Sequence, residues 1–205
     1  MVVPRTECLG IIARAGVAAA TWDHVGMDVL VIAATPGELD WVGGAETLVV
    51  GIGPVEAAAC TAAHLAVHRP DAILHVGIAG ARAASGLPIG TIVLGTESAY
   101  SDVDAAVPVV RTALPDPALL ERVALLLPAA QRLPIATSAR VGGGDRAVEA
   151  MEGFGVLRAA ALAGIPAVEL RAISNVVEEQ DRAKWDFAAG LLAVAAAGRS
   201  VLAGL

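Results

Sequence analysis

Short apolar runs that end at glycine or proline constrain the fold of this chain more than any other feature. Residues 29–34, 47–50 and 72–76 are such runs, and each is followed at once by a turn containing Gly or Pro. The run 29–34 is continuously apolar, which is typical of a strand buried on both faces of a sheet. The segment 54–68 has apolar residues at helical spacing. This alternation predicts an α/β fold with a parallel, doubly wound sheet.

The rest of the chain continues the alternation of strand and helix. The expected elements are a turn and strand over 88–95, a helix from Asp116-Pro117 to about Leu127, a strand over 135–141, a helix from about Gly153 to Gly164, a strand over 167–173 and a C-terminal helix near Arg182 capped by Asp181. Residues 101–117 are expected to be irregular, and the glycine segment 77–80 is expected to be a loop.

Length and composition favour one globular domain. The chain has 205 residues, of which 56% are hydrophobic and 17% charged, so a disordered chain is excluded. We expect a domain over 27–205 and an N-terminal extension of unknown role over 1–26. A net charge of −7, without a basic cluster, argues against nucleic acid and membrane partners. The apolar run 187–198 is too short to span a bilayer, so we expect a cytoplasmic protein.

The cysteines and histidines show no metal-binding pattern. Cys8 and Cys60 lie far apart, and we expect free thiols. His64 and His68 lie four residues apart on one helix face, but no acidic or Cys partner is evident beside them in the sequence. We therefore predict no metal and no cofactor.

Four polar or charged residues are placed where a ligand site is expected. Glu152 precedes a helix, Arg171 and Asn175 lie along and just beyond the next strand, and Glu38 follows the first strand. Open α/β sheets bind ligands at the carboxyl ends of their strands. The alternatives are that Glu38 is a solvated loop acid, that Arg171 and Glu169 lie on an exposed strand face, and that the glycine segments are plain turns.

These residues also resemble a known family. Met151-Glu152 before a helix, and Arg171-Ala-Ile-Ser-Asn175 at the end of the next strand, resemble the nucleoside phosphorylase/nucleosidase superfamily, and the match reaches back to Glu38. The resemblance covers roughly residues 27–205, and the segments 149–155, 171–178 and 181–185 look most like the futalosine hydrolases. It implies a single-domain three-layer αβα sandwich around a mixed, mostly parallel sheet.

The resemblance implies catalytic roles for four residues. Glu38 would activate water and Arg171 would help to hold it, which is general-base catalysis beside electrostatic stabilisation. Glu152 would accept hydrogen bonds from the ribose hydroxyls and support positive charge on the sugar. Asn175 would face the base, and its donor and acceptor suit a 6-oxopurine. The absence of a basic residue next to Glu38 in the sequence favours hydrolysis over phosphorolysis.

The same resemblance implies where the substrate binds. The expected substrate-binding residues are Met151, Gly53, Ile78, Gly80, Phe154 and Ser174. Ile78 stands where relatives that cleave methylthioadenosine tend to have Ser. The segment 142–148 looks shorter than in relatives, and Phe154 or Trp185 is a candidate to cover the base in its place.

The implied function is hydrolysis of the N-glycosidic bond of futalosine to hypoxanthine and dehypoxanthine futalosine, in menaquinone biosynthesis. Two alternatives stay open: a methylthioadenosine/adenosylhomocysteine nucleosidase, and a non-catalytic purine-nucleoside-binding protein. The resemblance also implies a homo-oligomer, either a dimer or larger.

Overall fold

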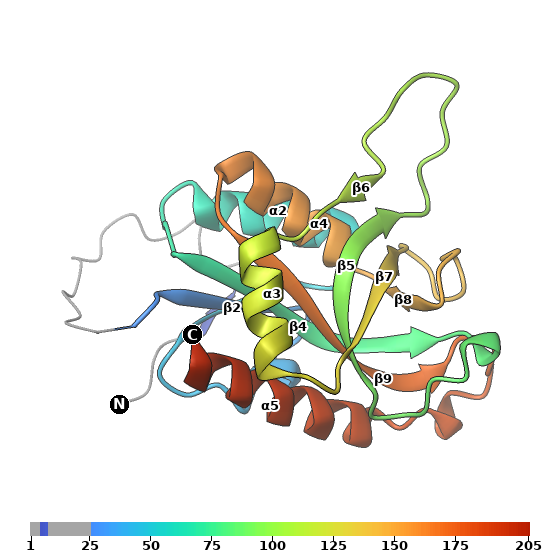
Figure 1. Cartoon of the computed structure of the whole chain (residues 1–205). Helices are drawn as coiled ribbons and strands as arrows, with labels where there is room; N and C mark the ends of the chain where they lie inside the picture. The colour runs from blue at the N-terminus through green and yellow to red at the C-terminus, as the bar shows by residue number, and fades with distance from the viewer. Residues whose placement is uncertain (1–4, 8–25) are drawn as a thin grey trace.

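The computed structural model describes residues 5–7 and 26–205, and the apolar runs form one sheet covered by helices on both faces (Figure 1). The strands are β1 (Arg5–Glu7), β2 (Val29–Ala33), β3 (Glu46–Val49), β4 (Ala72–Ala81), β5 (Ile92–Tyr100), β6 (Thr112–Ala113), β7 (Gln131–Thr137), β8 (Val148–Ala150) and β9 (Ala167–Val176). The α-helices are α2 (Pro54–Leu65), α3 (Pro117–Leu126), α4 (Gly153–Ala163) and α5 (Phe187–Gly204), and the 3-10 helices are η1 (Pro36–Leu39), η2 (Ala83–Ser85) and η3 (Arg182–Lys184).

The sheet is mixed and mostly parallel, as predicted from the resemblance. The parallel half has the order β1-β3-β2-β4-β9. β9 also pairs antiparallel with β5, which continues in parallel to β7 and then β8. β8 returns antiparallel to β4. β4, β9, β5, β7 and β8 therefore form a closed circuit of pairings, which the simple doubly wound pattern did not include.

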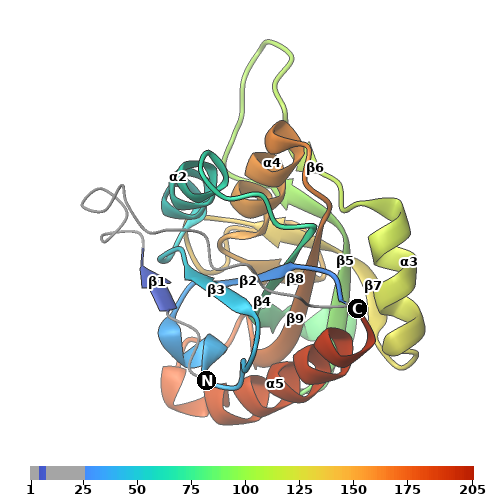
Figure 2. The same cartoon turned by 90° about the vertical axis from the view of Figure 1, so that its left-hand side faces the viewer.

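Alternating residues of the strands face two different helical layers. Val29, Val31 and Ala33 of β2 join a core cluster with α3 and α5, whereas Leu30 and Ile32 join a second cluster with α2 and α4. The two perpendicular views place α5 and the α2–α4 pair on opposite faces of the sheet (Figure 2). The predicted three-layer sandwich is confirmed, and the apolar strand runs are explained by burial on both faces.

Several strands are longer than the sequence indicated. The glycine segment 77–80, expected as a loop, belongs to β4, which continues to Ala81. β5 and β9 likewise extend to Tyr100 and Val176. The strand expected over 135–141 is β7, which begins and ends four residues earlier, and β8 was not foreseen. Glycine lowers strand propensity, but it is tolerated where other groups approach the backbone closely.

The C-terminal helix begins later than expected. Asp181 caps only the short η3, and α5 starts at Phe187, where the Asp186 side chain accepts a hydrogen bond from the amide of Ala189. By length and hydropathy α5 would be able to cross a membrane, but its face with Val194, Ala197 and Val201 packs on the sheet. This face of α5 therefore belongs to the core.

Two expectations concern the N-terminal region. The backbone of β1 pairs in parallel with β3, so this part of the predicted extension joins the sheet edge. The other residues before Gly26 lie outside the described residues. The prediction of free thiols is wrong for Cys60, which is disulfide-bonded; Cys8 lies outside the described residues.

Gly155 allows α4 to cross α2 at close range. A Cβ at this position would lie 2.5 Å from the Pro54 carbonyl oxygen and 3.0 Å from the Ala58 amide nitrogen. These are backbone atoms and cannot move aside cheaply. We expect Gly155→Ala to lower the free energy of unfolding by about 1–3 kcal/mol through overpacking, although alanine is normally the better helix former.

Urea denaturation would measure this change, with Gly43→Ala as the control because a Cβ on Gly43 meets nothing within 4 Å. An unchanged midpoint for Gly155→Ala would show that α2 and α4 can move apart at no cost.

Candidate active site

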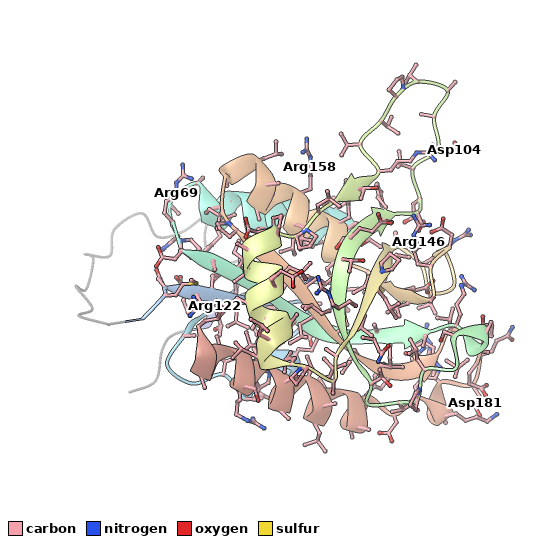
Figure 3. The ribbon with its side chains drawn as sticks, viewed as in Figure 1. Arg69, Asp104, Arg122, Arg146, Arg158 and Asp181 are labelled. Carbon is pink, nitrogen blue, oxygen red and sulfur yellow. The ribbon has the colours of Figure 1, made fainter. Side chains whose placement is uncertain are left out.

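Arg171, in the middle of β9, is the centre of the candidate site. Its side chain is 1% exposed, whereas Arg158 points outward from α4 (Figure 3). Arg171 Nε donates to Glu169 Oε1 at 2.8 Å, and Nη2 lies 2.5 Å from His75 Nε2 and 3.5 Å from Glu152 Oε2. The alternative that Arg171 and Glu169 lie on an exposed strand face is wrong, because both are buried.

Three carboxylates act on the buried guanidinium. Burial lowers the pKa of Arg171, but Glu169, Glu152 and Glu38 together raise it, and the net direction is upward. Arg171 therefore stays charged. With the three carboxylates ionised, the cluster has an excess of negative charge in a place with little water. Fixed charge of this kind stabilises a cation that develops nearby.

His75 holds the guanidinium from β4. Its Nε2 faces Arg171 Nη2, which can only donate, so Nε2 must accept and Nδ1 must carry the proton that faces the Ile32 carbonyl at 3.1 Å. Burial, and then the charge of Arg171, lower the pKa of His75 well below its usual range. His75 is thus a neutral acceptor in a fixed tautomer, and we assign it a positioning role.

Glu152 joins the start of α4 to the loop before α2. It is buried, it is the N-cap residue of α4, and its Oε1 accepts a hydrogen bond from the Gly53 amide at 3.1 Å. Gly53 has a φ of 98°, a conformation that favours glycine. Burial raises the pKa of Glu152, and the Arg171 charge and the Gly53 amide oppose the shift. Glu152 and Arg171, which the sequence was expected to bring into one site, lie side by side, and Gly53 joins them through its hydrogen bond to Glu152.

Glu38 approaches the same cluster from η1. Its Oε2 accepts from the amide and hydroxyl of Thr35, both at 2.9 Å, and its Oε1 accepts from the Ile78 amide at 3.1 Å. The alternative of a solvated loop acid is wrong, since Glu38 is buried. A Cβ on Gly77 would lie 2.2 Å from Arg171 Nη1 and 2.7 Å from Glu38 Oε1. Because Gly77 has no side chain, the Glu38 carboxylate and the Arg171 guanidinium can both pack against the backbone of β4 at this position.

Asn175 lies at the far end of β9, apart from the Arg171 cluster. It is 5% exposed, its Oδ1 accepts from the Ser174 hydroxyl at 2.9 Å, and its Nδ2 donates to the Val176 carbonyl at 3.3 Å. The β4–β9 register shifts beside Gly80, and a Cβ on Gly80 would lie 3.0 Å from Asn175 Nδ2. Such irregularities re-aim side chains. Asn175, Ser174 and Gly80 therefore form one group.

The other predicted substrate residues surround these groups with different contacts. Met151 is half-buried just before α4. Phe154 stacks on Tyr100 of β5, with ring centroids 5.1 Å apart. Ile78 faces α5, where a Cβ on Gly190 would lie 3.0 Å from its Cγ2. Trp185 packs edge-on against Phe187 at 5.7 Å, beyond the end of β9.

The side chain of Glu149 holds the short segment 142–148 in place by hydrogen bonds. Its carboxylate is buried, accepts hydrogen bonds from the amides of Gly142 and Gly144, and lies 3.8 Å from Arg82 Nη2. Arg82 also donates to the Gly144 carbonyl. Glu149 and Arg82, the N-cap residue of η2, therefore hold this short loop in place. Sequence reasoning gave Glu149 no role.

Sequence reasoning also missed the support behind Arg171. Ser98 of β5 donates to Glu169 Oε2, and Glu169 lies directly beneath Gly153 at the start of α4, where a Cβ would be 2.2 Å from the carboxylate. The only signal in the sequence was polar residues inside otherwise apolar strands.

A surface hollow of about 570 Å³, between residues 87–92 and 126–131, contains none of the predicted site residues. The assignment therefore rests on the convergent side chains.

Comparison with known families agrees with this geometry. The model of the phosphorylase superfamily matches residues 28–141, more than half of the chain. The chain belongs to this superfamily. The match includes η1, β4 and the glycine segments that hold Glu38 against Arg171, and it stops before Glu152 and β9.

Curated relatives of this superfamily member are nucleosidases. Futalosine hydrolase from Streptomyces coelicolor is 37% identical over 179 residues, which cover 74% of this chain and 75% of the relative. A 5'-methylthioadenosine/S-adenosylhomocysteine nucleosidase from Actinobacillus succinogenes is 46% identical over 54 residues, covering 26% of this chain and 23% of the relative.

Solved structures show the same fold. Futalosine hydrolase of Helicobacter pylori has a TM-score of 0.76 at 16% identity, covering 86% of this chain and 97% of that one. The Neisseria meningitidis 5'-methylthioadenosine/S-adenosylhomocysteine nucleosidase bound to methylthio-immucillin-A has a TM-score of 0.75 at 21% identity, covering 86% and 99%. The predicted superfamily, fold class and nucleosidase type of enzyme are confirmed.

Proposed function

We propose that this enzyme hydrolyses the N-glycosidic bond of futalosine, releasing hypoxanthine, with water as the nucleophile. The observation that carries the proposal is the placement of Asn175, a carboxamide, along the same strand as Arg171. The similarity to the Streptomyces coelicolor futalosine hydrolase supports it. The same proposal includes a role in menaquinone biosynthesis, a cytoplasmic location and a homo-oligomeric state.

Asn175 retains the two groups that a 6-oxopurine needs. A carboxamide has two donor hydrogens and an oxygen with two lone pairs. Ser174 occupies one lone pair and the Val176 carbonyl takes one hydrogen. One acceptor and one donor therefore remain for the ring N–H and carbonyl oxygen of hypoxanthine.

The distance between the two groups suits a nucleoside. Arg171 and Asn175 are four residues apart, or roughly 13 Å along the strand. In the proposed mode, the base lies at Asn175, the ribose lies against Met151 and Glu152, and the water lies between Glu38 and Arg171. Glu38 accepts a proton from the attacking water, whose oxygen bonds to C1′ of the ribose as the C1′–N bond breaks; the base leaves with the electron pair and takes up a proton from solvent to become hypoxanthine, and Glu38 returns its proton to solvent.

The charge of the site favours water over phosphate. The basic group next to Glu38 is Arg171, and it already interacts with Glu169 and Glu152. An inorganic phosphate anion placed there would meet three carboxylates. The same carboxylates suit the cationic, oxocarbenium-like sugar of the transition state.

An HPLC assay of futalosine in phosphate-free buffer tests the proposal. We expect hypoxanthine release at the same rate with and without phosphate. Methylthioadenosine in a parallel assay tests the alternative, which the local match to the Actinobacillus succinogenes nucleosidase favours. Faster release of adenine than of hypoxanthine would overturn the proposal.

The same assay applied to Asn175→Asp tests the assignment of Asn175 in particular. Aspartate keeps the acceptor but loses the donor that faces the hypoxanthine carbonyl. We expect kcat/KM for futalosine to fall by about 100-fold, because a charged oxygen then faces an acceptor. We also expect the ratio of adenine to hypoxanthine release to rise. An unchanged ratio would place the base elsewhere.

A further inference from the structure

A second group of ionisable side chains lies at the other end of α2 from the candidate active site. His64 lies in the last turn of α2, His68 follows the end of the helix and its amide donates to the His64 carbonyl, and Glu46 begins the neighbouring strand β3. Glu46 Oε1 lies 3.4 Å from His64 Nε2 and 3.9 Å from His68 Nδ1. The expectation that no acidic residue accompanies these histidines is therefore wrong, since a residue 18 positions upstream supplies the acid.

The imidazole of His64 is buried, and its ring nitrogens lack hydrogen-bond partners among the described residues. Its side chain is 1% exposed, and within residues 26–205 Nε2 has only the 3.4 Å contact with Glu46. Buried polar atoms are rarely left unsatisfied. The His68 ring stacks on His64 with centroids 4.3 Å apart and an interplanar angle of 8°. The pair is held with one nitrogen of each ring near the same carboxylate oxygen.

The three ligand atoms lie close enough together for small side-chain movements to bring them around one metal ion. His64 Nε2, His68 Nδ1 and Glu46 Oε1 all lie within 4.8 Å of one another. Zinc binds imidazole nitrogen and carboxylate oxygen at about 2.0–2.2 Å in a tetrahedral arrangement, so its ligand atoms lie roughly 3.3 Å apart. The 3.4 Å contact already meets this spacing, and the 3.9 Å contact has to close only slightly.

We propose that Glu46, His64 and His68 form a site for one divalent transition-metal ion of the Zn²⁺ class, with the remaining coordination position open to water. Two imidazoles and one carboxylate favour Zn²⁺, Co²⁺ or Ni²⁺ over Mg²⁺ and Ca²⁺, which prefer oxygen ligands alone. The exposed His68, at 51%, and Glu46, at 31%, provide access from solvent.

The position of the site indicates a structural role. α2 has 12 residues, or roughly 18 Å of helix, between this site and Gly53, which contacts Glu152 at the other end. A bound ion would join the end of α2 to the start of β3 without touching the proposed substrate.

Titration of the full-length, EDTA-treated protein with Zn²⁺ by calorimetry tests this proposal, with Co²⁺ visible absorption as an independent report of geometry. We expect one equivalent to bind and to raise the melting temperature. His68→Ala and Glu46→Gln should each weaken Zn²⁺ binding by about 100-fold or more, since even supporting residues of metal sites contribute 10–100-fold. Both residues are accessible to solvent, so these variants should fold more readily than a variant of the buried His64.

Glu121→Gln, at an acid on α3 that pairs with Arg132, is the control and should bind Zn²⁺ as the wild type does. Failure to bind one equivalent would overturn the proposal, and so would binding that neither variant weakens. A Co²⁺ complex without the intense absorption of a tetrahedral site would overturn the proposed geometry. Hypoxanthine release does not enter these measurements, so their outcome is separate from that of the proposed reaction.

Discussion

Glu38→Gln is expected to lower kcat for glycosidic cleavage by about 100- to 10,000-fold, the usual contribution of a positioned general base. The carboxamide cannot accept the proton of the attacking water, although it has the same size. KM should change little, because in the proposed mode Glu38 touches the water and not the nucleoside. Steady-state kinetics on futalosine would separate these two constants.

A structural side effect has to be distinguished from this chemical one. Glu38 accepts from the Thr35 amide through one oxygen and from the Ile78 amide through the other. Glutamine must turn its NH₂ group toward one of these two donors, so η1 is also expected to loosen. Thr35→Val is the matched control, since it removes a hydrogen bond to the same carboxylate but keeps the charge. Equal losses of kcat in both variants would mean that the integrity of η1 matters and that Glu38 is not the base.

The strand pattern was enough to predict that Glu38, Glu152 and Arg171 lie close together, but not that Asn175 forms a separate group. Glu38 follows β2, and Arg171 was expected near the carboxyl end of a strand over 167–173 in the same parallel part of the sheet, where such ends meet at one edge; in the structure Arg171 lies in the middle of the longer β9. Glu152 was predictable from its place at the start of α4. What the sequence did not reveal was how deeply these groups are buried, since the burial of a charge depends on partners from other strands.

The partners were hidden because they are distant in sequence and chemically ordinary. His75 lies 96 residues before Arg171, and a lone histidine in an apolar strand gives no sign of a guanidinium next to it. Glu46 and His64 are a similar case on the other side of the molecule. Their meeting depends on the offset between β3 and α2, which no local periodicity specifies.

Strand lengths were underestimated for a related reason. Gly77 and Gly80 are typical turn residues by propensity, yet both are inside β4, where Arg171, Glu38 and Asn175 occupy the space of a side chain. The site itself thus explains why glycine is needed there. The antiparallel pairing of β8 with β4 depends on Glu149 folding the short segment before it, which is again a tertiary effect.

Glu169→Gln is expected to destabilise the protein strongly, although Glu169 touches no proposed substrate atom. Glu169 is fully buried, receives the 2.8 Å hydrogen bond from Arg171 Nε, and accepts from Ser98. Removing one partner of a buried ion pair costs about 3–5 kcal/mol, and the remaining carboxylates Glu152 and Glu38 should keep the loss near 3 kcal/mol. For a chain of this size, that loss corresponds to roughly 6–12 °C in Tm.

A double variant distinguishes charge imbalance from lost packing. Glu169→Leu combined with Arg171→Met removes the pair and retains similar volume, and such replacements are often neutral for stability. We expect its Tm to lie above that of Glu169→Gln, although His75 then loses its donor, and we expect hydrolysis to be abolished because Arg171 is absent. Calorimetry on both variants, with the exposed Glu121→Gln as a control that should leave Tm unchanged, measures the difference.

If Glu169→Gln has the same Tm and the same kcat as the wild type, Glu152 and His75 alone suffice to orient the guanidinium. If the double variant is the less stable of the two, the pair stabilises the fold by its own attraction, and its presence in the core needs no catalytic reason.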